Sequence, residues 1–344
     1  MPNDKNLVRR QTHGALAVCL LHKERLAARL AATRKLFGPR VLAVDIHSHS
    51  TYSDGCSTVA QNVERATELS GLDFLFVTDH DTLTQRRAVA KFPRAGLGQE
   101  TFGADHHVGM LAPTKVHHGC PTLAQTLDEA RALAPFVWVA HPVDAIIADD
   151  PAAFEARVAE IAPLGDIAIE VLNGFVTIDH VYPGSRGHVK LFDRLLTMGR
   201  RVTPLAGSDA HGLVEFGGCW TGVHGARATA PSIIKALSAG RCFASESPIL
   251  DFACNGSPMG SVVRAVKGTP LTFTIRAADS YGLQQVRIIS GGKVVKQFRP
   301  CGDTVLAAEW TRAAGASPSY YRLEVIADDS RRAFSAPIYI TPSN

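Results

Sequence analysis

The chain has 344 residues, of which 46% are hydrophobic and 20% are charged, and its formal net charge at pH 7 is +4. This length predicts one large α/β domain with a smaller companion, and the small, scattered charge excludes a nucleic-acid-binding stripe and a polybasic membrane patch. The seven cysteines include no closely spaced pair. They favour a reducing cytoplasm over a disulfide scaffold or a thiolate zinc site.

Residues 5–36 are predicted to form an amphipathic helix. Leucines contribute to a loose apolar face on this stretch, namely Leu20, Leu21, Leu26, Leu30 and Leu36. We expect the helix to pack against the main domain, as an N-terminal helical extension over residues 1–40. No stretch of the chain has the apolar length that spans a bilayer, so we expect no membrane association.

An apolar run over residues 41–46 predicts a strand that ends in Asp45-x-His47-x-His49. Alternate side chains of a strand point to the same face, so these three residues project together. Two imidazoles about 7 Å apart along a strand end can converge on a metal ion. A His-x-His pair on a surface strand is also common without a metal, so the rest of the chain decides between the two interpretations.

Strands and helices then alternate, which is the pattern of a parallel sheet. Ser57 or Thr58 can cap a helix that runs through Leu69 and stops at Gly71. Further helices are predicted at about residues 121–133, 151–161 and 185–198. Strands are predicted at residues 72–78, 136–140, 167–172 and 202–206.

Side chains that bind metals follow these strands at the same topological position. The C-terminal ends of parallel strands meet at one edge of a sheet, where ligands and chemistry collect. Each such residue could alone be a core histidine or a helix cap, as Asp81 could be. Together they predict one shared site, formed by His47 and His49, Asp79-His80-Asp81, Asp105-His106-His107, His141, and Asp209 with His211.

From Ile249 the pattern changes to short alternating strands separated by Gly, Pro and Asn turns. Gly291-Gly292 signals a two-residue hairpin. The region predicts a small antiparallel β-sandwich over residues 249–344, with strands at residues 271–277, 285–290, 293–298, 304–310, 320–326 and 336–340. Its aromatic residues could stack on a sugar or line an interface, or pack in the core; they are Tyr281, Trp310, Tyr320 and Tyr321.

Five motifs together resemble the PHP (polymerase and histidinol phosphatase) superfamily of metallohydrolases, and their order and approximate spacing match over residues 41–212. The motifs are Asp45-x-His47-x-His49, Ser53-Asp54-Gly55, Thr78-Asp79-His80-Asp81, Ala140-His141-Pro142 and Gly207-Ser208-Asp209-Ala210-His211. Residues 236–243, Asn255-Gly256 and the tail ending in Pro337-Ile338-Tyr339 resemble the carbaryl-hydrolase-like branch. That branch joins a PHP domain to a C-terminal β-sandwich.

The resemblance implies a distorted (β/α)7 PHP-type barrel over residues 41–248, with two or three divalent metal ions at its mouth. It implies that His47, His49 and Asp209 bind the first metal and that Glu100 bridges it to a second. His107 and His141 would bind that second metal, and His106 is an alternative to His107.

The same resemblance places Asp54, His80 and His211 at a third metal or in contact with substrate. Some trinuclear members carry His where this chain has Asp54. The third metal therefore depends on whether a carboxylate serves in place of that imidazole.

A cluster of imidazoles and carboxylates suits Zn²⁺, Mn²⁺ or Fe²⁺, which lower the pKa of a bound water. Asp209 could orient that water or shuttle its proton. His80 and His211 could protonate the leaving oxygen or act only as ligands.

The PHP resemblance most often implies phosphate ester hydrolysis of a small molecule, with Lys115, Arg186 and His188 as candidates to bind phosphate. The carbaryl-hydrolase-like resemblance points instead to a carbamate, carboxylic ester or amide. A non-catalytic metal-binding scaffold is the alternative from another class. We expect no nucleic-acid partner.

Overall fold

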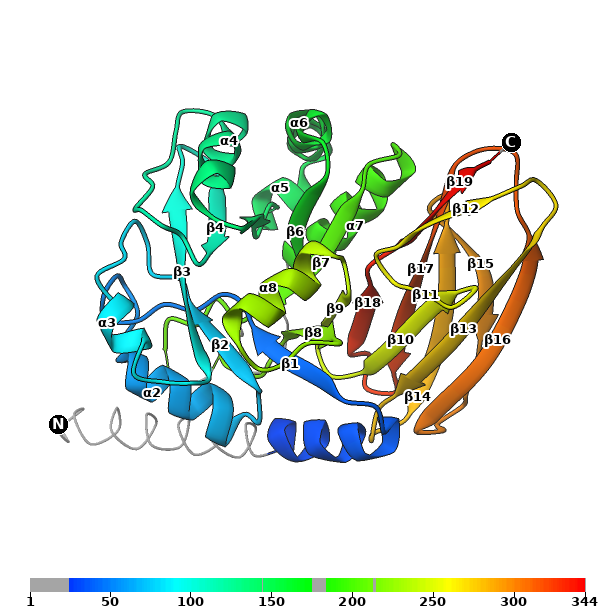
Figure 1. Ribbon diagram of the computed structural model, residues 1–344, viewed down its shortest axis with the longest axis horizontal. Helices are drawn as coiled ribbons and strands as arrows, with labels where there is room; N and C mark the ends of the chain where they lie inside the picture. The colour runs from blue at the N-terminus through cyan, green and yellow to red at the C-terminus, as the bar shows by residue number, and fades with distance from the viewer. Residues whose placement is uncertain (1–24, 144, 175–183, 213–214, 344) are drawn as a thin grey trace, which may run out of the picture.

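The structure is a computed structural model that describes residues 25–143, 145–174, 184–212 and 215–343 (Figure 1). A mixed sheet in the N-terminal part has the strand order β9-β8-β1-β2-β3-β4-β5-β6-β7. These strands are β1 (Val41–Asp45), β2 (Phe74–Val77), β3 (Ala95–Phe102), β4 (His107–Leu111), β5 (Phe136–Ala140), β6 (Ile167–Asn173), β7 (Val202–Gly207), β8 (Trp220–His224) and β9 (Cys242–Ser245).

This sheet combines parallel and antiparallel pairs. β1–β2, β2–β3, β5–β6 and β6–β7 are parallel. β3–β4, β4–β5, β1–β8 and β8–β9 are antiparallel. The sheet curls until β7 returns beside β8, where the Thr221 hydroxyl accepts a hydrogen bond from Ala206 N at 2.8 Å and donates one to Ala206 O at 2.7 Å.

The predicted (β/α)7 barrel is wrong. The structure has 38% strand and 25% helix, and its strands form a curled mixed sheet, a half-barrel. A parallel crossover needs a dozen or more residues, but only residues 103–106 separate β3 from β4. These two strands therefore form a hairpin, and β4 runs against both of its neighbours.

Helices occupy the connections that are long enough to hold them (Figure 1). They are α2 (Val59–Val63), the π-helix η1 (Glu64–Leu69), α3 (Arg86–Val89), α4 (Leu123–Leu133), α5 (Ala145–Asp149), α6 (Pro151–Ile161), the 3₁₀ helix η2 (Ala162–Leu164), α7 (Gly184–Thr197) and α8 (Ala230–Ser238). Thr58 caps α2 with a reciprocal Gln61 contact, and Asp150 caps α6, where Pro151 begins the first turn. None of the described helices combines the length and apolar character that crossing a bilayer requires.

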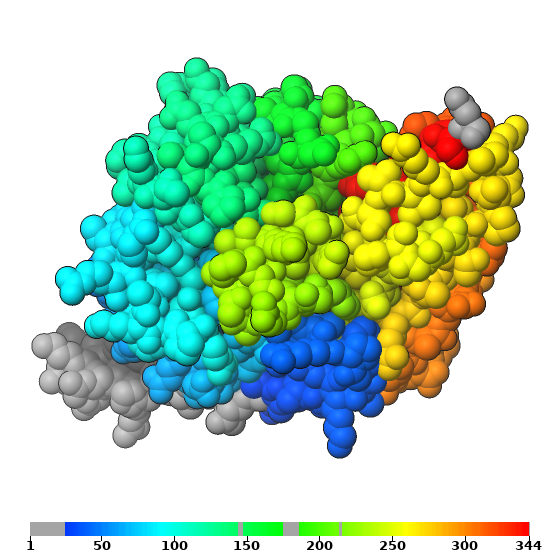
Figure 2. All heavy atoms as spheres, viewed as in Figure 1, coloured from blue at the N-terminus to red at the C-terminus, as the bar shows by residue number. Residues whose placement is uncertain are grey.

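The N-terminal helix is described over residues 25–37, and residues 5–24 lie outside the described residues. Its buried side carries Leu30, Phe37 and the charged Arg29. Leu36 is 38% exposed, so its predicted place on the apolar face is wrong. Arg29 forms a buried ion pair with Asp279 and a partly exposed one with Asp329, both in turns between the C-terminal strands. Figure 2 shows this helix, in blue, against those yellow and orange strands.

The C-terminal strands lie in two sheets. One is antiparallel, with the order β11-β10-β13-β16, and the other holds β14, β15, β17, β18, β19 and β12. Their bounds are β10 (Ile249–Cys254), β11 (Ser257–Pro258), β12 (Val262–Ala265), β13 (Pro270–Ala278), β14 (Leu283–Ser290), β15 (Lys293–Phe298), β16 (Val305–Ala313), β17 (Ser319–Ala327), β18 (Arg332–Ser335) and β19 (Ile338–Pro342). The predicted hairpin turn is confirmed, because Gly291 and Gly292 join β14 to β15 with φ of +56° and +69°.

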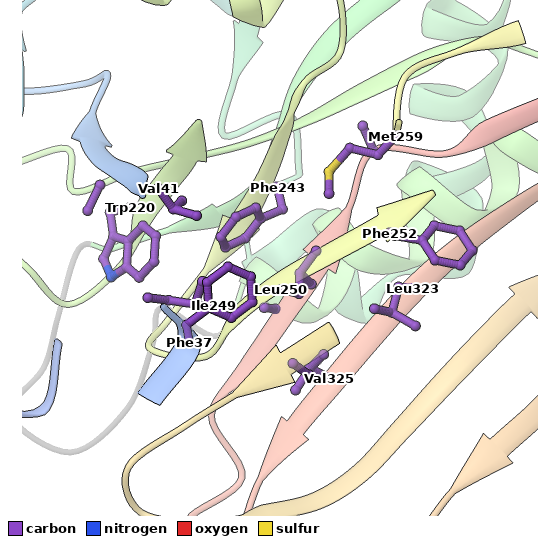
Figure 3. Close-up of a cluster of buried hydrophobic side chains, with 14 of the residues drawn as sticks. Phe37, Val41, Trp220, Phe243, Ile249, Leu250, Phe252, Met259, Leu323 and Val325 are labelled. Carbon is purple, nitrogen blue, oxygen red and sulfur yellow. The ribbon is translucent and has the colours of Figure 1, made fainter. Parts of the chain in front are cut away.

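One of the two C-terminal sheets continues into the N-terminal sheet. β18 pairs with β9 in antiparallel register, with Ala333 opposite Ser245. A shared hydrophobic core accompanies this shared sheet. Figure 3 shows Phe37, Phe243 and Ile249, from three segments of the chain, in that cluster. Residues on both sides of the predicted boundary between 248 and 249 thus contribute to one core cluster, and the division into domains stays a prediction.

Candidate metal centre

All nine predicted metal ligands lie in three adjoining clusters on the loops and strands at one edge of the sheet. Two backbone bridges hold these loops together, Ser48 with Ala210 and His80 with Glu100. Within each cluster, one ligand atom from every residue lies within 4.8 Å of the others. The residues are His47, His49, Asp54, His80, Glu100, His107, His141, Asp209 and His211.

The first cluster joins His47, His49, Glu100 and Asp209. Nε2 of His47 lies 3.0 Å from Glu100 Oε2 and 3.3 Å from Asp209 Oδ1. Nε2 of His49 lies 3.2 Å from each of the same two oxygens. Ligands of a tetrahedral ion with bonds of about 2.0 Å are separated by about 3.3 Å. The cluster therefore has the spacing of a four-ligand metal site.

The second cluster uses the other oxygen of Glu100. Oε1 lies 3.1 Å from His107 Nδ1 and 3.0 Å from His141 Nε2, and these two nitrogens are 3.2 Å apart. The neighbouring His106 instead bonds through Nε2 to the hydroxyl of Thr126 at 2.8 Å. The structure thus directs His107, and not His106, toward Glu100. One carboxylate faces two sets of imidazoles, one set per oxygen.

The third cluster is looser and more open to solvent. Asp54 Oδ2 lies 3.3 Å from His211 Nε2 and 3.6 Å from His80 Nε2, and the Asp54 side chain is 55% exposed. The loop that carries Asp54 is anchored by Asp79, whose carboxylate accepts hydrogen bonds from Ser50 N, Ser50 Oγ and Ser53 Oγ. A third ion or a substrate group would therefore bind on the solvent side of the first two clusters.

Glu170 is a buried support of the centre to which the sequence interpretation assigned no role. Oε1 contacts His47 Nδ1 at 2.7 Å and accepts from Trp138 Nε1 at 3.2 Å. Oε2 accepts from His141 N at 2.9 Å and from Asn173 Nδ2 at 3.0 Å. A carboxylate on the second nitrogen of a ligating histidine fixes the ring and makes it a stronger ligand. The available signal was a single charged residue inside an otherwise apolar strand.

Close backbone packing sets the positions of the ligands. A Cβ atom on Gly207 would lie 2.5 Å from His47 Cβ and 3.1 Å from Glu170 Oε1. Only glycine therefore lets β7 approach β1 at this point. His141 and Asp209 have φ of +24° and +51°, a region that side-chain-bearing residues adopt at a cost, often at functional sites.

The electrostatics of the clusters favour cations. Burial opposes protonation of His49, but Asp209 and Glu100 outweigh it and raise the pKa of His49 to about 9. Burial is similarly outweighed at His141, where Glu100 raises the pKa to about 9. Burial alone would raise the pKa of Glu100, yet His47 and the other imidazoles hold that pKa well below its usual range. Ionised carboxylates thus face imidazoles that readily take up positive charge.

The donor set fits divalent metal ions. Nδ1 of His49 is buried without a hydrogen-bond partner in the described part of the chain. Such orphaned atoms are uncommon in folded proteins. Imidazole and carboxylate ligands without thiolate suit Zn²⁺, Mn²⁺ or Fe²⁺. Ions bound there would supply positive charge to the ionised carboxylates and lower the pKa of a bound water.

Asp45 does not join the clusters, although it was predicted to project with His47 and His49. Its Oδ1 accepts hydrogen bonds from His47 N at 3.2 Å and Ser208 N at 3.0 Å. Burial raises the pKa of Asp45 to about 6. It therefore supports the backbone that carries the ligands.

The predicted substrate-binding residues differ in exposure. Lys115, before α4, and Arg186, on α7, are exposed, whereas His188 on α7 is buried. Their contact with a substrate stays a prediction. Sequence reasoning missed Phe102, which is 41% exposed and stacks on His80 with ring centroids 4.0 Å apart. It also meets the ring of His107 edge-on at 4.3 Å.

Comparison with known proteins gives one family match. A family model described as PHP-associated matches residues 198–242, a segment that includes Asp209 and His211. The match supports an association with the PHP superfamily. Together with the three clusters, it is compatible with a metal-dependent hydrolase. No curated protein sequence matches the chain.

Three solved structures have a distant similarity to this chain. The sulfur carrier protein SoxY from Chlorobium limicola is 10% identical over 28% of this chain and 79% of its own, with a TM-score of 0.22. Fibronectin(III)-like modules of Clostridium thermocellum CbhA are 23% identical over 26% of this chain and 92% of theirs, with a TM-score of 0.20. A β-glucuronidase of Bacteroides uniformis is 10% identical over 83% of this chain and 30% of its own, with a TM-score of 0.20.

Proposed function

We propose that this protein is a metal-dependent phosphoesterase that hydrolyses a small phosphorylated molecule. The observation that carries the proposal is the Glu100 carboxylate, each of whose oxygens faces its own pair of imidazoles at 3.0–3.2 Å. Paired metal sites of this kind stabilise the attacking and leaving oxygens of a phosphoryl displacement. Bound divalent ions would supply an activated water and polarise the phosphoryl oxygens.

The protein side chains orient the attacking water and supply a proton to the leaving oxygen in this proposal. Asp209 reaches both clusters, with Oδ1 toward His47 and His49 and Oδ2 at 3.9 Å from His141 Nε2. We assign it to orient the attacking water through Oδ2, which Asn173 Nδ2 also contacts at 3.2 Å.

His211 and His80 take different roles in this proposal. His211 lies beside Asp54 on the solvent side of the clusters, where it can donate a proton from Nε2 to the leaving oxygen. Burial lowers the pKa of His80 to about 4 despite the neighbouring Glu100. His80 is therefore assigned as a neutral ligand and not as the acid.

The test is hydrolysis of an aryl phosphomonoester, an aryl phosphodiester and an aryl N-methylcarbamate by metal-loaded protein. Phosphoesterase activity that is lost in Glu100→Gln and kept in Glu155→Gln, an exposed glutamate on α6, supports the proposal. Turnover of the carbamate alone would assign the protein to the carbamate and ester hydrolases, the activity expected of the carbaryl-hydrolase-like branch. Bound metal with no turnover of any substrate would indicate a metal-binding scaffold.

Substitutions of Phe102 and Arg186 test which groups of the substrate the protein contacts. The exposed Phe102 ring beside His80 and His107 offers an apolar surface next to the metal clusters. We expect Phe102→Ala to raise KM for aryl phosphates more than for alkyl phosphates, since only an aryl group can pack on the ring. If Arg186 binds phosphate, Arg186→Ala raises KM for both, and an unchanged KM places Arg186 on the solvated surface.

A further inference from the structure

A second group of metal-binding side chains lies outside the candidate metal centre. His117 and Cys120 are in the loop between β4 and α4, and Glu129 is on α4. One ligand atom from each lies within 4.8 Å of the other two. Nε2 of His117 is 3.1 Å from Glu129 Oε2, and the Cys120 thiol interacts with the same carboxylate. We call these three residues the loop cluster.

The backbone of the loop cluster is fixed by groups other than its ligands. The Gln99 side chain on β3 accepts a hydrogen bond from His117 N at 3.2 Å and donates one to His117 O. Cys120 N donates to the hydroxyl of Thr126 at 3.0 Å, and Thr126 lies on α4 one turn before Glu129. The three side chains are therefore held near one another while their ligand atoms stay available, which is the preorganisation that a metal site needs.

The loop cluster combines a buried imidazole with an exposed carboxylate. His117 is 4% exposed, and its Nδ1 has no hydrogen-bond partner in the described part of the chain. Among the described residues, Glu129 forms an ion pair only with His117. The nitrogen that faces the carboxylate is Nε2 of His117, and together with Glu129 and Cys120 it provides the imidazole, carboxylate and thiol groups that bind zinc.

A second group of potential metal ligands differs from the loop cluster because an arginine pairs with its carboxylates. Asp105, His106 and Glu160 also bring ligand atoms within 4.8 Å of one another. There the Arg157 guanidinium lies 2.6 Å from Glu160 and 3.8 Å from Asp105. The positive charge of Arg157 neutralises these carboxylates, so this group does not require a metal ion. The loop cluster has no arginine or lysine in that role among the described ion pairs.

We propose that the loop cluster binds one zinc ion, separate from the candidate metal centre, which joins the β4–α4 loop to α4. A thiolate, an imidazole and a carboxylate favour Zn²⁺ over Mg²⁺, Ca²⁺ and Mn²⁺. Zinc bonds of about 2.0–2.3 Å place tetrahedral ligands about 3.3–3.8 Å apart, so small side-chain rotations complete the site, and water takes the fourth position. On binding, the Cys120 thiol releases its proton to solvent.

The sequence disfavours a thiolate zinc site because its cysteines are not paired. The fold instead combines a single cysteine with ligands of other types, from a loop and a helix. The proposal also links the loop cluster to the metal centre, because Gln99 precedes Glu100 on β3. A zinc ion here would stabilise the strand that carries the bridging carboxylate.

Cobalt substitution tests the proposal on the full chain. Co²⁺ bound to a thiolate gives a ligand-to-metal charge-transfer absorption in the near ultraviolet, and no cysteine belongs to the three clusters of the candidate metal centre. We expect this band in the wild-type protein and its loss in Cys120→Ser. It should persist in Cys301→Ser, an exposed cysteine elsewhere in the chain, in Cys56→Ser, and in a His47→Ala/His49→Ala double variant.

Zinc content and thermal unfolding complete the test. Wild-type protein should bind one more equivalent of zinc than Cys120→Ser and should gain thermal stability from it. Glu129 is exposed, so Glu129→Gln should fold normally and bind this zinc more weakly. A charge-transfer band that survives Cys120→Ser, or cobalt bound by wild type without such a band, would overturn the proposal.

Discussion

Replacing Glu170 with Gln should weaken metal binding by about 10–100-fold. Four donors share the two carboxylate oxygens of Glu170, at 2.7–3.2 Å. Glutamine has one oxygen and one NH₂ group, so two of these donors would face another donor. One of the two comes from a metal-binding histidine, either the His47 ring or the His141 backbone. A hydrogen bond to a charged group contributes about 1.5–3 kcal/mol, which corresponds to that loss of affinity.

Competition with a calibrated chelator measures this effect. The dissociation constant of the Glu170→Gln variant should rise by the stated factor, and activity should recover at high metal concentration, because the catalytic groups themselves are unchanged. Glu155→Gln removes an exposed carboxylate on α6 and should change neither quantity. Circular dichroism confirms that both variants are folded. An unchanged dissociation constant in folded Glu170→Gln would refute the supporting role of Glu170.

Three further predictions concern stability. His49 and His141 have folded pKa values of about 9, above the unfolded value near 6.5. Their protonation therefore stabilises the metal-free protein below pH 6.5, and this contribution is lost as the pH rises through 9. The Tm of metal-free protein should fall over this window, whereas that of metal-loaded protein should not. Gly207→Ala should cost about 1–3 kcal/mol in denaturant unfolding and lower metal content, because its Cβ would clash with His47. Arg29→Ala should cost about 3–5 kcal/mol, because it leaves a buried aspartate unpaired.

Matched controls separate these effects from general damage. Gly315 has open space around its Cβ position, so Gly315→Ala should leave metal content unchanged. Arg194 is paired with Glu155 at the surface, so Arg194→Ala should cost less than about 1 kcal/mol. A Tm of metal-free protein that rises from pH 6.5 to 9 would contradict the assigned pKa shifts. Equal losses in Arg29→Ala and Arg194→Ala would contradict the buried pairing.

The sequence predicted much of the candidate site because short motifs at strand ends carry most of the ligands. His47 and His49, for example, lie two residues apart just after β1, so their convergence follows from local geometry. Glu170 was missed because its role depends on partners on β5 and on the segments that follow β1 and β5, which no local pattern reveals. Phe102 was missed for the same reason, since its stacking on His80 joins two separate strand ends.

The fold was predicted less well, because it also depends on contacts between residues that are far apart in the sequence. Several helices and strands fall within two residues of their predicted bounds, as α6 and β5 do. Strand direction, however, depends on connection length, and the short β3–β4 connection reverses β4. The pairing of β18 with β9 joins residues about ninety positions apart and connects the C-terminal strands to the main sheet. An alternating pattern indicates that a segment is a strand, but it does not identify the distant strand with which that segment pairs.

The central claim is that Glu100 bridges two metal ions. Anomalous diffraction from crystals loaded with Mn²⁺ or Zn²⁺ tests it most directly, because it locates each ion without reference to activity. We predict two peaks on either side of the Glu100 carboxylate, about 3.5–4 Å apart, one beside His47 and His49 and the other beside His107 and His141. A single peak, or two peaks that do not share Glu100, would contradict the bridged centre.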